Sequence, residues 1–218
     1  LSALAPADGK RVRLTFSDVE VTASHAILAV PSRSLKSVQG IPPVIRALLD
    51  SVIEYPLLKC FFVVKDPWWE EDIPNAGVLN VPARELHYRR EGDKGIVMIY
   101  ADSPYRNYWT KYVTAANHDR AELDLNRDLQ VVFAERMGIS ADSVIATGIR
   151  DWVRRPYGAG VHLWKGGVRP WEVSERIEAF SLTSGSPANV HICGEAFSDY
   201  QGFTEGALRS ARSVLGTI

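Results

Sequence analysis

The residues whose types and spacing best suit chemistry lie near the end of the chain, where Gly194 and Glu195 follow a short apolar run at 190–193. Glycine has no side chain to hold a ligand away, so the backbone and one carboxylate can approach that ligand closely. A helix is expected to begin near Gly202, and its free N–H groups and positive dipole end attract electron-rich oxygens. The pattern therefore predicts either a binding site for a phosphate or a flavin ring, or a plain turn between a strand and a helix.

A lysine beside an apolar run is the second candidate. Lys59 directly precedes the run at 60–64, and a charged ammonium in such a place is costly unless it has a partner or a chemical role. The residues alone leave two interpretations open, a solvated lysine at the end of a strand and a functional one.

Two further candidates come from aromatic residues. Glycines and aromatic residues alternate between 151 and 171, a segment that contains Trp152, Gly160 and His162. This alternation suits a backbone that passes against a flat ring, but glycine-rich loops that merely turn have the same composition. Tyr100 ends an expected strand, and its hydroxyl is either satisfied within the core or available to a substrate.

A mixture of strands and helices must position these candidates. Alternating and β-branched runs predict strands, and apolar residues spaced three and four apart predict helices. The expected strands are 11–16, 19–22, 26–30, 55–69, 85–90, 96–100 and 190–193, and the expected helices are 44–52, 117–138 and the one that begins near 202. Turn residues at 91–95 join two of these strands into a hairpin.

Composition bounds the class of protein. The chain has 218 residues, 46% of them hydrophobic, with 25 Lys and Arg against 26 Asp and Glu. It can bury one sizeable core or two small ones, and it has no basic excess for nucleic-acid binding. We expect no membrane span, no signal peptide at Leu1 and no metal site. Cys60 and Cys193 are expected to be buried free thiols, which favours the cytoplasm.

The phosphate-binding loop of dinucleotide folds, Gly-x-Gly-x-x-Gly, does not occur in this sequence. Its nearest candidates are Gly158 with Gly160, and Gly166 with Gly167, and neither pair is expected to follow a strand and open a helix. The ADP-binding half of such a fold is thus expected to lie outside this chain, which is then a processed chain, one subunit of a split enzyme or a partial chain.

As a whole string, the end of the chain resembles the carboxyl-terminal FAD segment of the flavin-dependent amine oxidase superfamily, which includes monoamine, polyamine and L-amino acid oxidases. The matching residues are Gly194-Glu195 and Gly202-Phe203-Thr204-Glu205-Gly206-Ala207. Two other stretches are similar to the same superfamily. Lys59, Lys65, Pro67 and Trp69 match a monoamine oxidase strand, and 152–160 resembles the stretch that runs along the flavin.

The resemblance implies an α/β (α+β mixed) fold. We expect an antiparallel substrate-domain sheet with helices, plus the last strand and helix of an FAD-binding dinucleotide fold whose N-terminal Gly-x-Gly-x-x-Gly half is missing. Residues 1–31 would return into the FAD-binding domain, 32–150 would form the substrate-binding domain, and 151–218 would form the FAD-binding carboxyl-terminal segment. The implied partner is a companion chain that carries the dinucleotide-binding half.

The resemblance also implies roles for single residues. Lys59 is the catalytic candidate, because the family's lysine holds a water against flavin N5. Tyr100, His162 and Phe203 are expected to contact the substrate, the last two in place of a tyrosine pair. The expected cofactor contacts are Trp152, Gly160, Gly194, Glu195, Gly202, Phe203 and Thr204. Val161 stands where monoamine oxidases carry a flavin-bonded cysteine, so the FAD is expected to be non-covalent.

The implied function is oxidative deamination of an L-amino acid, with hydride transfer to flavin N5 and reoxidation by dioxygen to give hydrogen peroxide. Tyr100 and the absent tyrosine pair favour an amino acid over an amine. Three alternatives stay open, namely an amine or polyamine oxidase, an amino acid 2-monooxygenase on the same scaffold, and a non-catalytic subunit or fragment.

Overall fold

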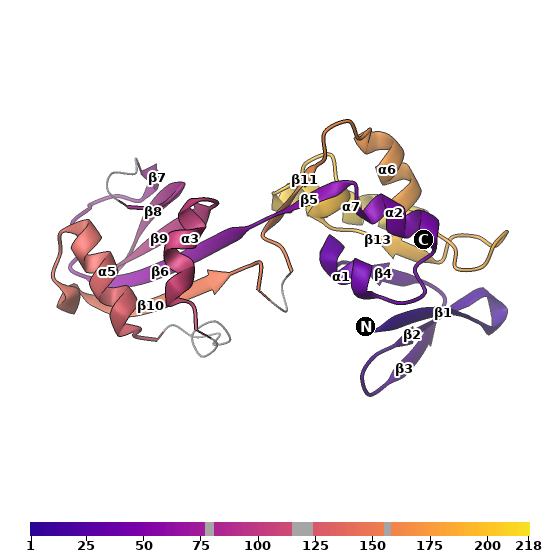
Figure 1. Ribbon diagram of the computed structural model, residues 1–218, viewed down its shortest axis with the longest axis horizontal. Coiled ribbons are helices and arrows are strands. Elements are labelled where there is room, and N and C mark those ends of the chain that lie inside the picture. Colours follow the sequence, from indigo (N-terminus) through magenta and orange to yellow (C-terminus); the bar gives the residue numbers. More distant parts are fainter. Residues whose placement is uncertain (77–80, 115–123, 155–157) are drawn as a thin grey trace. The chain divides into compact units, whose positions relative to one another are not determined.

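The computed structural model describes residues 1–76, 81–114, 124–154 and 158–218 (Figure 1). The chain forms two compact units. Unit 1 contains Leu1–Tyr55 and Pro156–Ile218, and unit 2 contains Pro56–Arg155. Residues 32–55 thus belong with the terminal segments, whereas the sequence grouped them with the middle of the chain. The functional division into 1–31, 32–150 and 151–218 stays a prediction.

Unit 1 contains three small sheets. An antiparallel sheet has the order β1-β2-β3, from Ala3–Ala7, Arg11–Thr15 and Glu20–Ala23. A second sheet has the order β12-β13-β4, from Ala179–Phe180, Val190–Ile192 and Ala26–Leu28, and its β13–β4 pair is parallel. The third pairs β11 (Val161–Trp164) with β5 (Val52–Tyr55) antiparallel.

Helices complete the core of unit 1. They are α1 (Ser32–Ser37), α2 (Pro43–Leu49), α6 (Pro170–Ile177) and α7 (Thr204–Thr217), with short 3-10 turns η1 (Asp8–Lys10) and η4 (Glu195–Phe197). Pro43 begins α2, where the missing N–H group of proline costs little. Buried residues from both ends of the chain share this core, among them Leu35, Leu49, Ile177 and Val190. The expected strand at 190–193 and the helix beginning near Gly202 are therefore confirmed as β13 and α7.

Unit 2 is built on one five-stranded antiparallel sheet with the order β10-β6-β9-β8-β7. Its strands are Val144–Asp151, Leu57–Lys65, Lys94–Asp102, Glu85–Glu91 and Ile73–Ala76 in that order, and the 85–90 and 96–100 hairpin is confirmed as β8 and β9. Residues alternate between the two faces of a strand. One face of β6 is fully buried through Leu58, Cys60 and Phe62.

Helices cover that buried face of the unit 2 sheet. These are α3 (Tyr105–Trp109) and α5 (Arg127–Met137), with the 3-10 turns η2 (Thr110–Tyr112) and η3 (Ala141–Ser143). Phe133 of α5 stacks on Phe62 of β6, with ring centroids 3.7 Å apart, and Trp109 of α3 joins the same core. The helices thus bury one face of the sheet and leave the other face uncovered.

The expected helix over 117–138 is wrong over 124–126 and confirmed over 127–137. Residues 117–123 lie outside the described part of the chain, and α5 begins only at Arg127. Asn126 caps this helix by accepting the N–H of Leu129 at 3.1 Å, while Asp124 pairs with Thr147 beside β10. The sheet thus takes the residues before the cap, although the end at Gly138 is confirmed by its left-handed φ of 67°.

Both cysteines are free, and Cys60 is buried as expected, whereas Cys193 is only partly buried.

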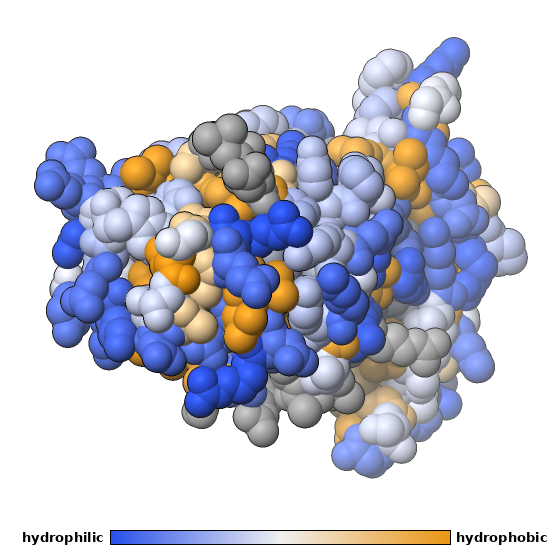
Figure 2. All heavy atoms as spheres, turned by 60° about the vertical axis from the view of Figure 1, so that its left-hand side comes forward, coloured by the Kyte–Doolittle hydropathy of each residue, from blue (hydrophilic) through white to orange (hydrophobic). Residues whose placement is uncertain are grey.

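Among the described helices, none is long and apolar enough to cross a membrane. On the face displayed in Figure 2, hydrophobic side chains gather in small patches among hydrophilic ones. Patches of this kind are ordinary on a protein surface.

Candidate functional site

Glu195 connects three segments of unit 1 through its two carboxylate oxygens. Oε1 lies 2.5 Å from Nδ1 of His162 on β11, and Oε2 accepts the N–H of Gly202 at 2.8 Å, just before α7. A carboxylate accepts hydrogen bonds, so Nδ1 is the donor of this pair. The predicted residues His162, Glu195 and Gly202 therefore form one cluster.

Local backbone geometry holds Glu195 in place. Gly194 has a φ of 133°, a conformation that residues with a side chain rarely adopt. Its N–H donates to Oγ of Ser210 on α7 at 2.8 Å, and the same hydroxyl donates to the Gly194 carbonyl at 2.9 Å. The hydroxyl of Ser198 donates to the Glu195 carbonyl at 3.0 Å. Gly194 is thus needed for the sharp turn, and Ser210 of α7 holds that turn in place.

The start of α7 is packed too closely for any side chain at two glycine positions. A Cβ on Gly202 would lie 2.8 Å from Cγ2 of Val161, and one on Gly206 would collide with the carbonyl of Tyr200. Phe203 and Thr204 lie at this helix start and are exposed, Phe203 by 62%. The first N–H groups of α7 have no side-chain cap, so the helix presents donors and its positive dipole end there.

A hollow of about 210 Å³ lies beside this cluster. Its lining comes from three segments, the end of β4 with the residues after it, the residues before and on β11, and the turn at 194–196: Ala29, Val30, Pro31, Ala159, Gly160, His162, Gly194, Glu195 and Ala196. His162 is only 3% exposed, and its Nε2 has no hydrogen-bond partner. A buried polar atom without a partner is unfavourable by about 1–3 kcal/mol.

The remaining predicted residues lie in unit 2. Lys59 is partly buried on β6, directly opposite Tyr100 of β9, and its Nζ lies 5.5 Å from the centre of the Tyr100 ring. Arg84 lies 6.0 Å from the same ring. Burial raises the pKa of Tyr100, opposed by Arg84 and reinforced by Glu85 and Asp102, so its hydroxyl remains a donor at neutral pH. The structure brings Lys59 and Tyr100 together. Trp152 follows β10, and its N–H donates to the Leu57 carbonyl at 3.0 Å.

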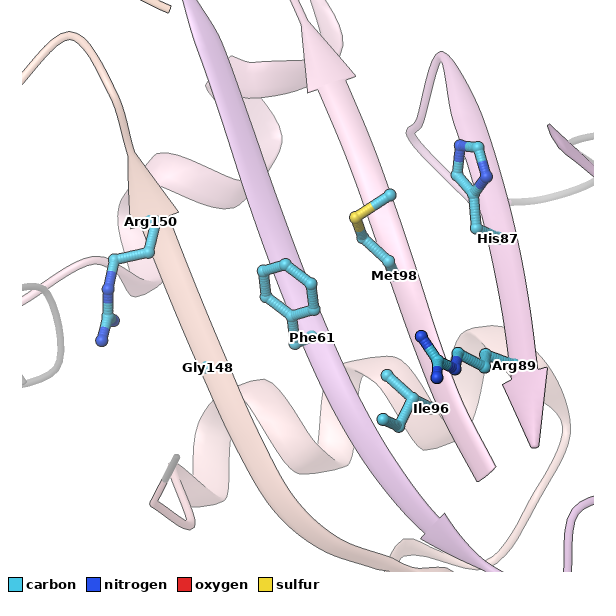
Figure 3. A pocket seen from close by; sticks show the side chains of 7 residues that line it. All are labelled: Phe61, His87, Arg89, Ile96, Met98, Gly148 and Arg150. Carbon is cyan, nitrogen blue, oxygen red and sulfur yellow. The ribbon is translucent and has the colours of Figure 1, made fainter. Parts of the chain in front are cut away.

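The uncovered face of the unit 2 sheet carries a pocket of about 570 Å³ (Figure 3). Its floor is apolar, from Phe61, Ile96 and Met98, and Gly148 opposite Phe61 leaves room beside that ring. Arg89 and Arg150 also line it. Figure 3 shows these side chains on the side of the sheet opposite to the helices.

Sequence reasoning missed both arginines of this pocket. The available signal was strand alternation, because Arg89 lies opposite Ile96, and Arg150 lies opposite Lys59. Sequence reasoning also missed an ion pair between α3 and β10, in which Arg106 donates to both oxygens of Asp151 at 2.9 and 2.6 Å. In the described residues no three His, Cys, Asp or Glu side chains gather as metal ligands.

Unit 1 is a mixed α/β unit with a parallel strand pair, a turn after β13 and a long helix with an uncapped start. Ligands of α/β folds bind beyond the carboxyl ends of such strands. The chain belongs to the family of flavin-containing amine oxidoreductases, whose sequence profile matches residues 1–214. Family membership implies a flavin cofactor and oxidoreductase chemistry.

Proteins similar to this chain include a viral protein and two solved amine oxidases. An uncharacterized protein, R188, of Acanthamoeba polyphaga mimivirus is 25% identical over 219 aligned residues, which cover 93% of this chain and 41% of that protein. Cyclohexylamine oxidase from Brevibacterium oxydans IH-35A has a similar structure, with a TM-score of 0.70 and 14% identity over 99% of this chain and 46% of its own. Wild-type putrescine oxidase bound to putrescine has a TM-score of 0.65 and 17% identity over 98% of this chain and 47% of its own. The chain thus spans less than half the length of each.

The residues of unit 1 fit a flavin. His162 and Glu195 line a hollow, and Gly194 keeps the backbone beside that hollow free of a side chain. The described glycines do not form the phosphate-binding loop of a dinucleotide fold. The residues of unit 1 can therefore contact only part of the flavin cofactor.

Proposed function

We propose that this chain is part of an FAD-dependent oxidase that deaminates an L-amino acid and forms hydrogen peroxide. The observation that carries the amino-acid preference is the charge around the apolar pocket of unit 2. Arg150 lines it and lies opposite Lys59, whereas Arg89, which also lines it, is paired with Glu91 at 3.0 Å. The carboxylate of Glu85 is already engaged by His87 at 3.0 Å. A cationic surface attracts a substrate that carries a carboxylate and disfavours a bare alkylammonium ion.

A bound flavin would supply the redox chemistry, as acceptor of a hydride from the substrate carbon, and the protein would supply orientation and charge. Lys59 is proposed to hold a water for the reaction with dioxygen. The Tyr100 hydroxyl, kept protonated, is proposed to donate to the substrate carboxylate. The substrate contacts expected of His162 and Phe203 stay predictions. The proposed cofactor contacts are Trp152, Gly160, Gly194, Glu195, Gly202, Phe203 and Thr204.

Binding of FAD is proposed to be non-covalent, because Val161 offers no nucleophile. The phosphate-binding half of the site is proposed to reside in a segment or companion chain outside this sequence, which is supported by the share of each relative that the chain covers. A cytoplasmic location agrees with the two free cysteines.

The test compares an amino acid with the amine that lacks only its carboxylate. In the FAD-loaded enzyme, kcat/KM for L-phenylalanine should exceed that for phenethylamine, and Arg150→Met should reduce this ratio about tenfold or more, since a hydrogen bond to a charged group contributes about 1.5–3 kcal/mol. Arg154→Met, which removes an exposed cation that does not line the pocket, is the matched control. A higher kcat/KM for the amine would contradict the amino-acid assignment.

Amine or polyamine oxidation is the second candidate, supported by the structural likeness to putrescine and cyclohexylamine oxidases. An amino acid 2-monooxygenase uses the same first step. Product analysis separates the three, since only the monooxygenase would release carbon dioxide and an amide. A non-catalytic role would be indicated by a flavin that none of these substrates reduces.

A further inference from the structure

We propose that the apolar floor of the unit 2 pocket binds the side chain of the substrate, and that Gly148 makes the pocket wide enough for one ring. This inference rests on the function proposed above and names the substrate class of the same site, which is amino acids with a benzyl-sized apolar side chain. All the residues that carry it belong to the one sheet of unit 2.

Strand register places the pocket residues in one row across four strands. Gly148 of β10 lies opposite Phe61 of β6, Phe61 lies opposite Met98 of β9, and Met98 lies opposite His87 of β8. Residues of one row point to the same face of a sheet, and Figure 3 shows this row on the face away from the helices. A side chain at position 148 would fill the space beside the Phe61 ring or push that ring over the floor, so glycine there keeps the pocket open.

The middle of the pocket suits an apolar group. Its volume of about 570 Å³ lies within the range of about 300–1,000 Å³ that is typical of small-molecule sites. The basic side chains on its β8 side already have acidic partners, since His87 lies 3.0 Å from Glu85 and Arg89 lies 3.0 Å from Glu91. The floor between them and β10 consists of Phe61, Ile96 and Met98. A ligand group that covers this floor gains chiefly from burial of apolar surface.

The neighbouring row of the sheet sets the length of the side chain. Arg150, Lys59 and Tyr100 lie opposite one another, two residues along the strands from the row that contains Phe61 and Met98. Two residues of an antiparallel strand span about 6.8 Å. A carboxylate held at the polar row therefore places a benzyl group over the apolar row, whereas the methyl group of alanine does not reach it.

Two carboxylates without an amino group test the side-chain site by binding alone. The probes are 3-phenylpropanoate and propanoate, which share the carboxylate and differ by the ring. Isothermal titration calorimetry of the FAD-loaded protein should give a Kd about 10–100-fold lower for 3-phenylpropanoate, as expected for burial of one aromatic side chain. Equal affinities for the two carboxylates would overturn the proposal.

Substitution of Gly148 tests its role in the width of the pocket. Gly148→Val should weaken binding of 3-phenylpropanoate about tenfold, by loss of the apolar contact, and leave binding of propanoate unchanged. Gly166→Val is the control, because its new Cβ meets no atom within 4 Å and it lies outside the pocket. Phe61→Leu keeps the floor apolar and should lower the preference for the ring without a change at position 148. An equal effect of Gly148→Val on both carboxylates would contradict the role of Gly148.

This inference and the proposed function fail in different ways. If the two carboxylates bind equally well while L-phenylalanine is oxidised faster than phenethylamine, the side-chain site is wrong and the amino acid oxidase function stands. If 3-phenylpropanoate binds more tightly than propanoate but no amino acid reduces the flavin, the proposed oxidation is wrong, and the group that the pocket holds is not the side chain of a substrate.

Discussion

At the scale of single residues, Glu195 is the position where sequence and structure give complementary views. The sequence marked it as a cofactor contact because a carboxylate follows a glycine. In the structure its oxygens bind His162 and Gly202. Both oxygens are thus engaged within the protein, and the proposed cofactor contact of Glu195 would act through the imidazole and the start of α7. The hydrogen bond between Glu195 and His162 could not be predicted, because the two residues are distant in the chain. The family resemblance gave His162 only the role of an aromatic wall.

Lys59 permits a test with a control on the same strand. Lys59→Met should slow reoxidation of the reduced flavin by dioxygen about tenfold or more, since removal of one positioned donor in an active site often costs 10²–10³-fold. Stopped-flow absorbance measures this rate. Lys65→Met removes an exposed lysine at the end of β6 and should leave the rate unchanged. Equal rates for wild type and Lys59→Met would remove Lys59 from the mechanism.

The free energy of unfolding should depend on pH through His191. Burial lowers the pKa of His191 below its ordinary value of 6.5, and His25, 3.0 Å away, adds to this, while Glu178 opposes it. Below pH 6.5 the unfolded chain therefore binds a proton that the folded chain resists. The free energy of unfolding should fall as the pH drops from that value through the lowered pKa.

Urea unfolding at several pH values measures this dependence. His191→Gln should show a shallower decline below pH 6.5, and His25→Gln should show an intermediate one because burial remains. An identical pH dependence in wild type and His191→Gln would mean that His191 does not contribute.

At the scale of elements, the start of α7 depends on close approach of its backbone to the turn before it. Gly206→Ala should destabilise unit 1 by about 1–3 kcal/mol, because the new Cβ meets the Tyr200 carbonyl and the Ser198 hydroxyl. Gly216→Ala on the same helix meets no atom within 4 Å and should be neutral or stabilising by up to about 1 kcal/mol. Chemical denaturation distinguishes them. A loss of stability in both variants would point to a general effect on the helix.

In unit 2, the Arg106–Asp151 pair should stabilise the junction of α3 and β10. Asp151 is 1% exposed, so Asp151→Asn leaves Arg106 without its counter-charge and should destabilise the protein by about 3–5 kcal/mol. Asp199→Asn breaks an exposed pair with Arg209 and should change stability little. Similar midpoints for both variants in urea would show that the buried pair contributes no more than a surface one.

Elements were predicted well wherever local pattern decides them. Alternation identified β8 and β9, and glycine placement identified the end of α5 and the start of α7. The start of α5 was misplaced because Leu125 fits the apolar spacing of a helix, yet it lies before the cap and is 39% exposed. Cross-strand neighbours such as Arg150 and Lys59 depend on register, which a single sequence does not reveal.

At the scale of the whole molecule, both units carry predicted site residues. Unit 1 has the Glu195–His162 cluster with its hollow, and unit 2 has Lys59 and Tyr100 beside a pocket with a cationic rim. The family was recognisable from short strings of residues, and the profile match over residues 1–214 agrees with it. The proposed substrate preference could not be read from such strings, because it rests on side chains such as Arg150 that no motif marks.

The central claim is that this chain contributes to a flavin-binding oxidase, and the visible absorption spectrum tests it most directly. The protein should be purified from its native source, with a denaturing gel to show which chains accompany it. We predict the spectrum of an oxidised flavin, which bleaches when L-phenylalanine is added without oxygen and returns when air is admitted. A colourless protein that remains colourless and binds no FAD on incubation, alone or with any chain that copurifies, would contradict the account.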